Sequence, residues 1–353
     1  MKLFFPKKHY DKNYRRHVFA LLKPFLRAES FTDEDRQKNY GVSEKDFTFT
    51  DSIEDADLVI LTMSWLYYKI TDQIDKAIVF IKIANKLNKK VLLALPSDFG
   101  LKIPKDLDVI IVREQGYKTR HMPNHYCVPV FVEDPLIKYY QQTNIITRNY
   151  NEKPTVGFCG QADGGILGAL KEFEMISARN VLYYLGIRAK TPHKLLITKR
   201  LRFNLLKKLE TSSIVKSNFI IRKKHRAGIK NLKERDMHQS TFEFFDNIRD
   251  SDYVLCARGV GNFSVRFYET LAMGRIPIFV DTDCMLPHDE LLNWKDHVVW
   301  VDYNDRHRIA EIVSDFHSKL DQEKLNNLFK ANRKLWEEKL KLKTYFKTLF
   351  EYI

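Results

Sequence analysis

Short apolar runs alternate with a stretch of helical periodicity in the first half of the chain. Apolar residues recur at helical spacing between Ile74 and Leu87, which predicts a helix over Asp72–Leu87. The runs around it are almost continuously apolar, which is typical of strands in a parallel sheet covered on both faces. We predict strands at Leu3–Phe5, Asp57–Met63, Val91–Leu95 and Val109–Val112. Strand, helix and strand in this order indicate a parallel βαβ unit.

The same alternation starts again after a polar stretch near the middle of the chain. Residues Pro129–Pro154 lack a firm hydrophobic period, and a glycine-rich turn and a helix up to about Leu185 follow the next strand. A further helix is predicted after Ser264. The predicted strands are Thr155–Cys159, Ser217–Ile221, Tyr253–Ala257, Ile276–Val280 and His297–Val301. The pattern predicts an α/β protein with two Rossmann-like, doubly wound domains that face a cleft.

Chain length supports this division, because 353 residues exceed the size at which one hydrophobic core usually keeps growing. We place the first domain at residues 1–150 and the second at residues 151–321. Residues 322–353 carry apolar positions at rough helical spacing among many Lys and Glu residues. This predicts a C-terminal helix that packs on the domains, with a helix lying on a membrane surface as the alternative.

Positive charge is concentrated in one segment. Residues Arg188–Arg235 hold 16 Lys and Arg side chains against Glu210 and Glu234, a difference that equals the net charge of +14 of the whole chain. Such a segment indicates a surface for an anionic partner, which can be nucleotide phosphate, an acidic glycan, a membrane face or nucleic acid. A solvated basic surface is the plain alternative.

The four cysteines are far apart and form no CxxC pair, which favours buried free thiols in a reducing compartment. The apolar patch at the N-terminus is three residues long, too short for a signal-peptide core. Later apolar stretches fall short of the roughly 20 residues of a membrane span. We therefore expect a cytoplasmic protein, with peripheral contact at the inner face of a membrane as an option left open by the basic segment.

The densest group of chemically capable residues lies between Ser251 and Trp294. The predicted strand Tyr253–Ala257 leads into Arg258 and a loop of small residues, and Arg266 lies in the helix that follows. A junction of strand, loop and helix presents free backbone N–H groups and the positive end of the helix dipole, which suits a diphosphate. Arginine can bind phosphate oxygens in a bidentate way and stabilise a departing nucleoside diphosphate without a metal. The predicted donor-site residues here are Arg258, Gly259, Ser264 and Arg266.

Glu269 follows Arg266 by three residues, so the two share one helix face. A carboxylate in this place can accept hydrogen bonds from both hydroxyls of a ribose, as acidic residues do in dinucleotide-binding folds. An Arg266–Glu269 ion pair on the surface is the alternative. Gly274 is expected to end this helix.

This segment resembles the C-terminal half of the exostosin family of glycosyltransferases. The resemblance rests on ARGVGNFSVRFYETLAMGRIPIFVDTDCMLPHDELLNW, with weaker echoes in VGFCGQADGG, DSIEDADLVILTMSWLYY and LLALPSDFG. It implies a GT-B arrangement, an inverting mechanism, donor binding by the C-terminal domain and acceptor binding by the N-terminal domain. By motif position it assigns Arg258, Arg266 and Glu269 to the donor site. Many members have an N-terminal membrane helix, and this sequence departs from them there.

Two further sites follow from the expected reaction. Gly160 lies in a glycine cluster after the strand Thr155–Cys159, where backbone can approach the donor closely, although a tight turn explains it equally well. An inverting transfer needs a base for the proton of the acceptor hydroxyl. Asp98 is the first candidate, because it follows the carboxyl end of Val91–Leu95. A turn residue in PSDFG is its alternative role, and the other candidate bases are Glu114, His121 and His125.

The expected partners are a nucleotide-diphosphate sugar and a glycan acceptor, which can be anionic. We expect no cofactor and no metal: Asp281 and Asp283 superficially match a manganese-binding DxD, but that motif belongs to a different, single-domain architecture.

Two other functions remain open. A nucleic-acid-binding protein could use residues 188–235, although these match no recognition module. A NAD-dependent oxidoreductase could share the fold, although GxGxxG is missing.

Overall fold

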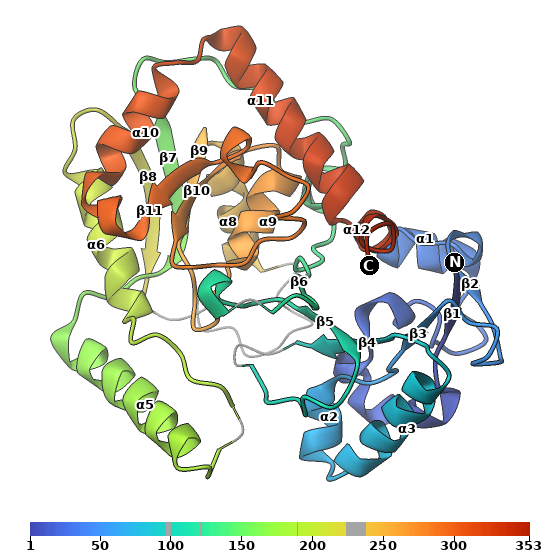
Figure 1. Cartoon of the computed structure of the whole chain (residues 1–353). Coiled ribbons are helices and arrows are strands. Elements are labelled where there is room, and N and C mark those ends of the chain that lie inside the picture. The colour runs from blue at the N-terminus through green and yellow to red at the C-terminus, as the bar shows by residue number, and fades with distance from the viewer. Residues whose placement is uncertain (97–99, 121, 189, 224–237) are drawn as a thin grey trace.

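The computed structural model contains two parallel sheets, each with helices on both faces (Figure 1). It describes residues 1–96, 100–120, 122–188, 190–223 and 238–353. The strands of the first sheet, in the order β2-β1-β3-β4-β5-β6, are β1 (Lys2–Phe4), β2 (Thr48–Phe49), β3 (Leu58–Ile60), β4 (Val91–Leu95), β5 (Val109–Arg113) and β6 (His125–Cys127). Those of the second, in the order β11-β10-β9-β7-β8, are β7 (Thr155–Gln161), β8 (Lys216–Arg222), β9 (Tyr253–Cys256), β10 (Ile276–Asp281) and β11 (Val299–Asp302). The prediction of two parallel α/β sheets is confirmed.

The first sheet is covered by helices from both ends of the chain. The helices of this half are α1 (Asp33–Tyr40), α2 (Trp65–Ile70) and α3 (Ile74–Lys86), whereas α4 (Pro135–Tyr140) packs with Leu136 in the core of the second half. Short 3₁₀ helices η1 (Lys7–His9), η2 (Lys12–His17), η3 (Ala20–Leu22), η4 (Glu44–Asp46) and η5 (Lys118–Arg120) connect them. The helix predicted from residue 72 begins at Ile74, because Asp72 has a left-handed φ of 55° in the turn between α2 and α3.

The second sheet is covered on one face by α6 (Thr198–Glu210) and α10 (Ile309–His317), and on the other by α8 (Gln239–Arg249) and α9 (Val265–Ala272). The helix α5 (Ile166–Tyr184) stands outside both layers, and η7 (Trp294–Asp296) and η8 (Tyr303–Arg308) lie in the later loops (Figure 1). Gly274 ends α9 with a left-handed φ of 64°, while the N–H of Arg275 donates to the carbonyl of Thr270 (2.9 Å). The predicted helix end is confirmed.

The C-terminal segment ties the two halves together. Residues 322–353, predicted as a helix, form α11 (Gln322–Leu335), the π-helix η9 (Trp336–Leu340) and α12 (Leu342–Leu349), because Lys341 has extended backbone. α11 packs on the core of the second sheet, whereas Tyr345 and Phe346 of α12 are fully buried in the core of the first sheet. The boundaries at residues 150 and 321 stay predictions. All four cysteines are buried and free, and in the described ranges no helix is long and apolar enough to cross a membrane.

Candidate functional site

Both sheets have the strand order that places a ligand site between their first and third strands. In the second sheet, β7 has β8 on one side and β9 on the other, so the connections after β7 and β9 leave the sheet in different directions. Ligands of open α/β sheets collect at such a switch point, outside the carboxyl ends of the strands. The corresponding switch point of the first sheet lies between β1 and β3.

Arg266 lies directly across the switch point of the second sheet. Its Nη2 donates to the carbonyl of Cys159 at the end of β7 (2.7 Å), and its Nη1 lies 3.4 Å from the carbonyl of Leu255 in β9. The guanidinium stacks 4.3 Å from the ring centre of Phe158. Its Nε is buried without a hydrogen-bond partner in the structure. A guanidinium has five N–H groups, so Arg266 retains donors for a ligand after these contacts.

Arg202 is a second guanidinium at the same strand end, and sequence reasoning missed it. Its Nη1 donates to the carbonyl of Gln161, the last residue of β7 (2.8 Å), and its Nε to Thr198 (3.4 Å). Burial, and then the positive charge of Arg266, lower the pKa of Arg202 to about 10, so it remains charged at neutral pH. A signal was present in the sequence, because Arg202 precedes the buried residues Leu205 and Leu206 by three and four positions and therefore shares their helix face.

Gly160 lies between the two carbonyls that hold these arginines. A Cβ at this position would come within 2.7 Å of Nη2 of Arg266. The absence of a side chain therefore allows the guanidinium to lie against the end of β7. The structure brings Gly160 and Arg266 together, as the predicted donor site requires, and it adds Arg202 to them.

Glu269 lies one turn after Arg266 on α9 and is half-buried. Its negative charge raises the pKa of Arg266, against a larger lowering by burial. The two side chains are therefore near each other on one helix face, as their spacing predicts. A carboxylate and a cation one turn apart on the same face of α9 can contact different parts of one ligand.

Arg258 lies at the end of β9, and its side chain is engaged by residues from far along the chain. It is only 4% exposed. Its Nη1 donates to Oη of Tyr117 (3.3 Å), and its Nη2 donates to the carbonyl of Val260 (2.9 Å) and approaches Nδ1 of His193 (3.4 Å). Tyr117 and His193 are themselves joined at 3.0 Å. A ligand can reach Arg258 only after these contacts separate.

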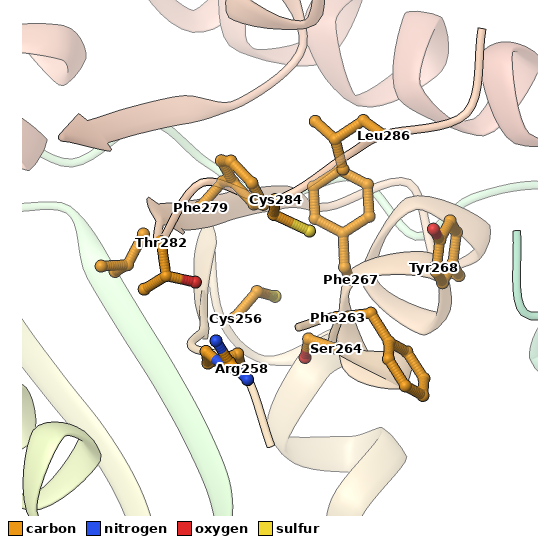
Figure 2. A pocket seen from close by; sticks show the side chains of 11 residues that line it. Cys256, Arg258, Phe263, Ser264, Phe267, Tyr268, Phe279, Thr282, Cys284 and Leu286 are labelled. Atoms are coloured by element: carbon orange, nitrogen blue, oxygen red, sulfur yellow. The ribbon is translucent and has the colours of Figure 1, made fainter. Parts of the chain in front are cut away.

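The loop after Arg258 encloses a small pocket rather than an open one. Ser264, Cys256, Cys284 and Phe267 line it, with Arg258 at one side (Figure 2). Its volume is about 10 Å³, which is the space of about one water molecule. Gly259 is half-buried, and the space where its Cβ would lie is open. Ser264 begins α9 without a capping hydrogen bond from its side chain.

The two aspartates of the DxD-like sequence have structural partners. Asp281 accepts hydrogen bonds from the N–H groups of Asp283 (2.8 Å) and Cys284 (3.0 Å), which closes a turn. Asp283 accepts from the Thr119 hydroxyl (2.6 Å) and pairs with Lys194 (2.9 Å), and these hydrogen bonds lower its pKa against the effect of burial. Across the described ranges, no group of three or more His, Cys, Asp or Glu side chains has the arrangement of a metal site.

The candidate bases are distributed differently. Asp98 and His121 lie outside the described residues. Glu114 directly follows β5 and is half-buried. Burial lowers the pKa of Lys23, and the negative charge of Glu114 opposes this lowering. His125 lies on β6, and its Nδ1 is 3.4 Å from Nη1 of Arg113. The catalytic roles of Asp98, Arg258 and Arg266 stay predictions.

A second pocket lies at the switch point of the first sheet. It has a volume of about 410 Å³, which is an ordinary size for a ligand site. The lining residues follow β1 and lie on α2 and α3: Lys8, His9, Tyr10, Asp11, Lys12, Asn13, Tyr67 and Lys76. Both oxygens of Asp11 are engaged, by the Tyr67 hydroxyl (3.1 Å) and the N–H of Asn13 (2.9 Å). The lysines therefore give this pocket a positive potential.

Residues 191–316 match the family model of the Exostosin GT47 domain. Over 104 residues the chain is 26% identical to Exostosin-1 of Drosophila melanogaster, an alignment that covers 30% of this chain and 13% of that protein. The chain thus spans a small part of its curated relative.

Similar solved structures include TarM of S. aureus, in a complex with UDP, at 8% identity and a TM-score of 0.39, covering 83% of this chain and 54% of that one. The rhamnosyltransferase SpnG, complexed with thymidine diphosphate, has 11% identity and a TM-score of 0.29, covering 80% and 72%. The exostosin resemblance predicted from Ser251–Trp294 is confirmed by the domain match, which spans residues 191–316 and contains Arg202, Arg258, Arg266 and Glu269.

Proposed function

We propose that the chain is an inverting glycosyltransferase that moves a sugar from a nucleotide-diphosphate sugar to a hydroxyl of a glycan or polysaccharide. The observation that carries this proposal is the pair of guanidiniums at the end of β7, inside the segment that matches the Exostosin GT47 domain. Two like charges brought together in a partly desolvated place are costly without an anion. A diphosphate between Arg266 and Arg202 would supply the missing negative charge.

These two arginines are proposed to act on the leaving group. As the bond between the anomeric carbon and the diphosphate breaks, negative charge grows on the phosphate oxygen. Guanidinium N–H groups aimed at that oxygen stabilise the growing charge and can replace a metal ion in this role. Burial lowers the pKa of both arginines, but Arg202, whose value is about 10, stays protonated at pH 7. Metal independence is part of the proposal.

Glu269 is proposed to accept hydrogen bonds from the ribose hydroxyls of the donor. Its position one turn after Arg266 on α9 supports this role. Arg258 would add its charge only after it leaves Tyr117 and His193. We therefore assign ground-state binding of the diphosphate to Arg266 and Arg202, and a later contact to Arg258.

The acceptor is proposed to bind to the N-terminal half. The pocket at the β1/β3 switch point carries Lys8, Lys12 and Lys76, which favour an anionic acceptor. In the reaction, the acceptor hydroxyl attacks the anomeric carbon opposite the departing diphosphate and loses its proton to a carboxylate or histidine. Asp98 remains the first candidate for this base.

Ligand binding tests the proposal most directly. We expect a nucleoside diphosphate from a panel of UDP, GDP, CDP and TDP to raise the melting temperature, whereas NAD and short oligonucleotides do not, because only a specific ligand of the folded state stabilises it at modest concentration. NMR of the product made from the matching sugar donor should show inversion at the anomeric carbon. Stabilisation by NAD or by oligonucleotides alone would contradict the proposal.

A further inference from the structure

The pocket at the switch point of the first sheet contains a histidine that is held from one side. His9 lines the pocket and is only 9% exposed. Its Nδ1 lies 2.7 Å from the hydroxyl of Tyr68. That hydroxyl belongs to a fully buried residue and, in the part of the chain that the structure describes, it has no other acceptor for its proton. Because a buried O–H without an acceptor is costly, Tyr68 donates to Nδ1 of His9.

His9 therefore has its own proton on the opposite ring nitrogen. Burial, and then the positive charge of Lys76, lower the pKa of His9 to about 4, so the ring is neutral at pH 7 and has one N–H. Since Nδ1 is the acceptor, this N–H is on Nε2. Among the described residues, Nε2 has no hydrogen-bond partner. The pocket thus contains a fixed donor that a ligand can use.

Three lysines line the same pocket. They are Lys8, Lys12 and Lys76, and across the described ranges none of them forms a salt bridge. Nζ of Lys76 lies 3.4 Å from the carbonyl of Lys8, so this ammonium group is directed at the loop that follows β1. Three lysines against one aspartate, Asp11, give the lining a net charge of +2. Such a pocket attracts an anion.

The single carboxylate of the lining is held by the protein itself. One oxygen of Asp11 accepts the N–H of Asn13 (2.9 Å), and the other accepts the hydroxyl of Tyr67 (3.1 Å). The Tyr67 hydroxyl in turn accepts a hydrogen bond from the side-chain amide of Gln73 (3.3 Å). Asp75, in the first turn of α3, is exposed and does not line the pocket. Asp11 therefore fixes the shape of the loop, and the groups left for a ligand are the lysines and His9.

We propose that this pocket binds the phosphate of a phosphorylated sugar, with Nε2 of His9 and the three lysines as the hydrogen-bond donors. A phosphate monoester has a charge of about −1.5 to −2 at pH 7, which matches the lining, whereas a carboxylate leaves one positive charge unmatched. The rings of Tyr10 and Tyr67 offer apolar surface for the sugar. That this sugar is the acceptor rests on the proposed function, but the binding of its phosphate does not.

Calorimetric titration of the full chain with sugar esters tests this proposal. A saturating nucleoside diphosphate keeps the arginines at the end of β7 occupied; if none of the panel binds, the variant Arg202→Gln is titrated in place of the wild type. The ligands are the 6-phosphates of glucose, mannose and N-acetylglucosamine. We expect at least one of them to bind ~10-fold more tightly than its 6-sulfate, which has a similar shape and a single negative charge, and than glucuronic acid. Inorganic phosphate should bind more weakly, because the contacts of the sugar are lost.

Substitutions in the pocket separate it from the donor site. Lys12→Gln with Lys76→Gln should weaken the sugar phosphate at least ~10-fold and leave the affinity for the nucleoside diphosphate unchanged. Lys86→Gln with Lys90→Gln is the matched control, because both lysines are exposed, lie outside the pocket and remove the same charge. His9→Gln, which keeps an N–H donor, should retain more affinity than His9→Phe.

Three results would overturn the proposal. They are equal binding of sugar phosphate by the Lys12/Lys76 variant and the wild type, equal binding of the 6-phosphate and the 6-sulfate, and inorganic phosphate binding as tightly as every sugar phosphate. The last result would assign the pocket to free phosphate. Each of them leaves the stabilisation by a nucleoside diphosphate unaffected, so failure of this proposal is distinguishable from failure of the proposed sugar transfer.

Discussion

Replacement of Arg202 by Gln should change the free energy of unfolding of the unliganded protein little and weaken nucleotide binding strongly. The lowering of the Arg202 pKa from 12.5 to about 10 corresponds to roughly 3 kcal/mol against the charged form in the folded state, at 1.36 kcal/mol per pKa unit. The substitution removes this cost together with the hydrogen bonds to Gln161 and Thr198. These opposing effects are of similar size, so we expect the free energy of unfolding to change by less than ~1 kcal/mol.

The substitution Arg202→Gln should change the affinity for a nucleoside diphosphate far more than it changes the free energy of unfolding. A charge-assisted hydrogen bond contributes about 1.5–3 kcal/mol, so Arg202→Gln should weaken the preferred nucleoside diphosphate ~10- to 100-fold. Calorimetric titration with the diphosphate and the matching monophosphate measures this, and the monophosphate should lose less. Arg200→Gln, an exposed neighbour on α6, is the matched control and should leave both affinities unchanged. If the wild type binds the diphosphate tightly and Arg202→Gln binds it equally well, Arg202 does not contact the diphosphate. That result would leave the rest of the proposed donor site standing.

Three further outcomes are expected. Glu269→Ala should weaken nucleotide binding by about 1–3 kcal/mol in a folded protein, and unchanged affinity in calorimetry would exclude the ribose contact. Phe346→Ala should lower the free energy of unfolding by about 3–5 kcal/mol in urea titrations, because a fully buried ring of α12 leaves a cavity in the first core. Burial lowers the pKa of His288 to about 4 from 6.5, which disfavours the protonated form in the folded state. The free energy of unfolding should therefore fall as the pH drops from 6.5 towards 4, and the variant His288→Gln should show a smaller fall when unfolding is measured across this range.

Local periodicity is what made part of the site predictable. Arg266 and Glu269 share a face because three residues make almost one helical turn, and Gly274 ends α9 because its left-handed backbone carries no cost without a Cβ. Neither conclusion requires knowledge of distant residues. Arg202 was missed for the opposite reason. It lies in a strongly basic segment, where its spacing from Leu205 and Leu206 indicates a buried helix face, but only the packing of α6 against the end of β7 shows that it contacts the carbonyl of Gln161.

The surroundings of Arg258 could not be predicted from local periodicity, because they depend on how the loop after β5 packs against the second half of the chain. Tyr117 follows β5 of the first sheet, and its hydroxyl accepts hydrogen bonds from Arg258 (3.3 Å) and from the N–H of Lys194 (3.2 Å). The side-chain amide of Asn262 holds the preceding loop through the carbonyl of Gly116 (2.8 Å). No periodicity in either domain encodes such contacts, because each partner is polar and lies in a loop. A diphosphate offers Arg258 stronger, charge-assisted hydrogen bonds than the Tyr117 hydroxyl does, so the proposed contact of Arg258 with the donor requires the Tyr117 hydroxyl to separate from this guanidinium.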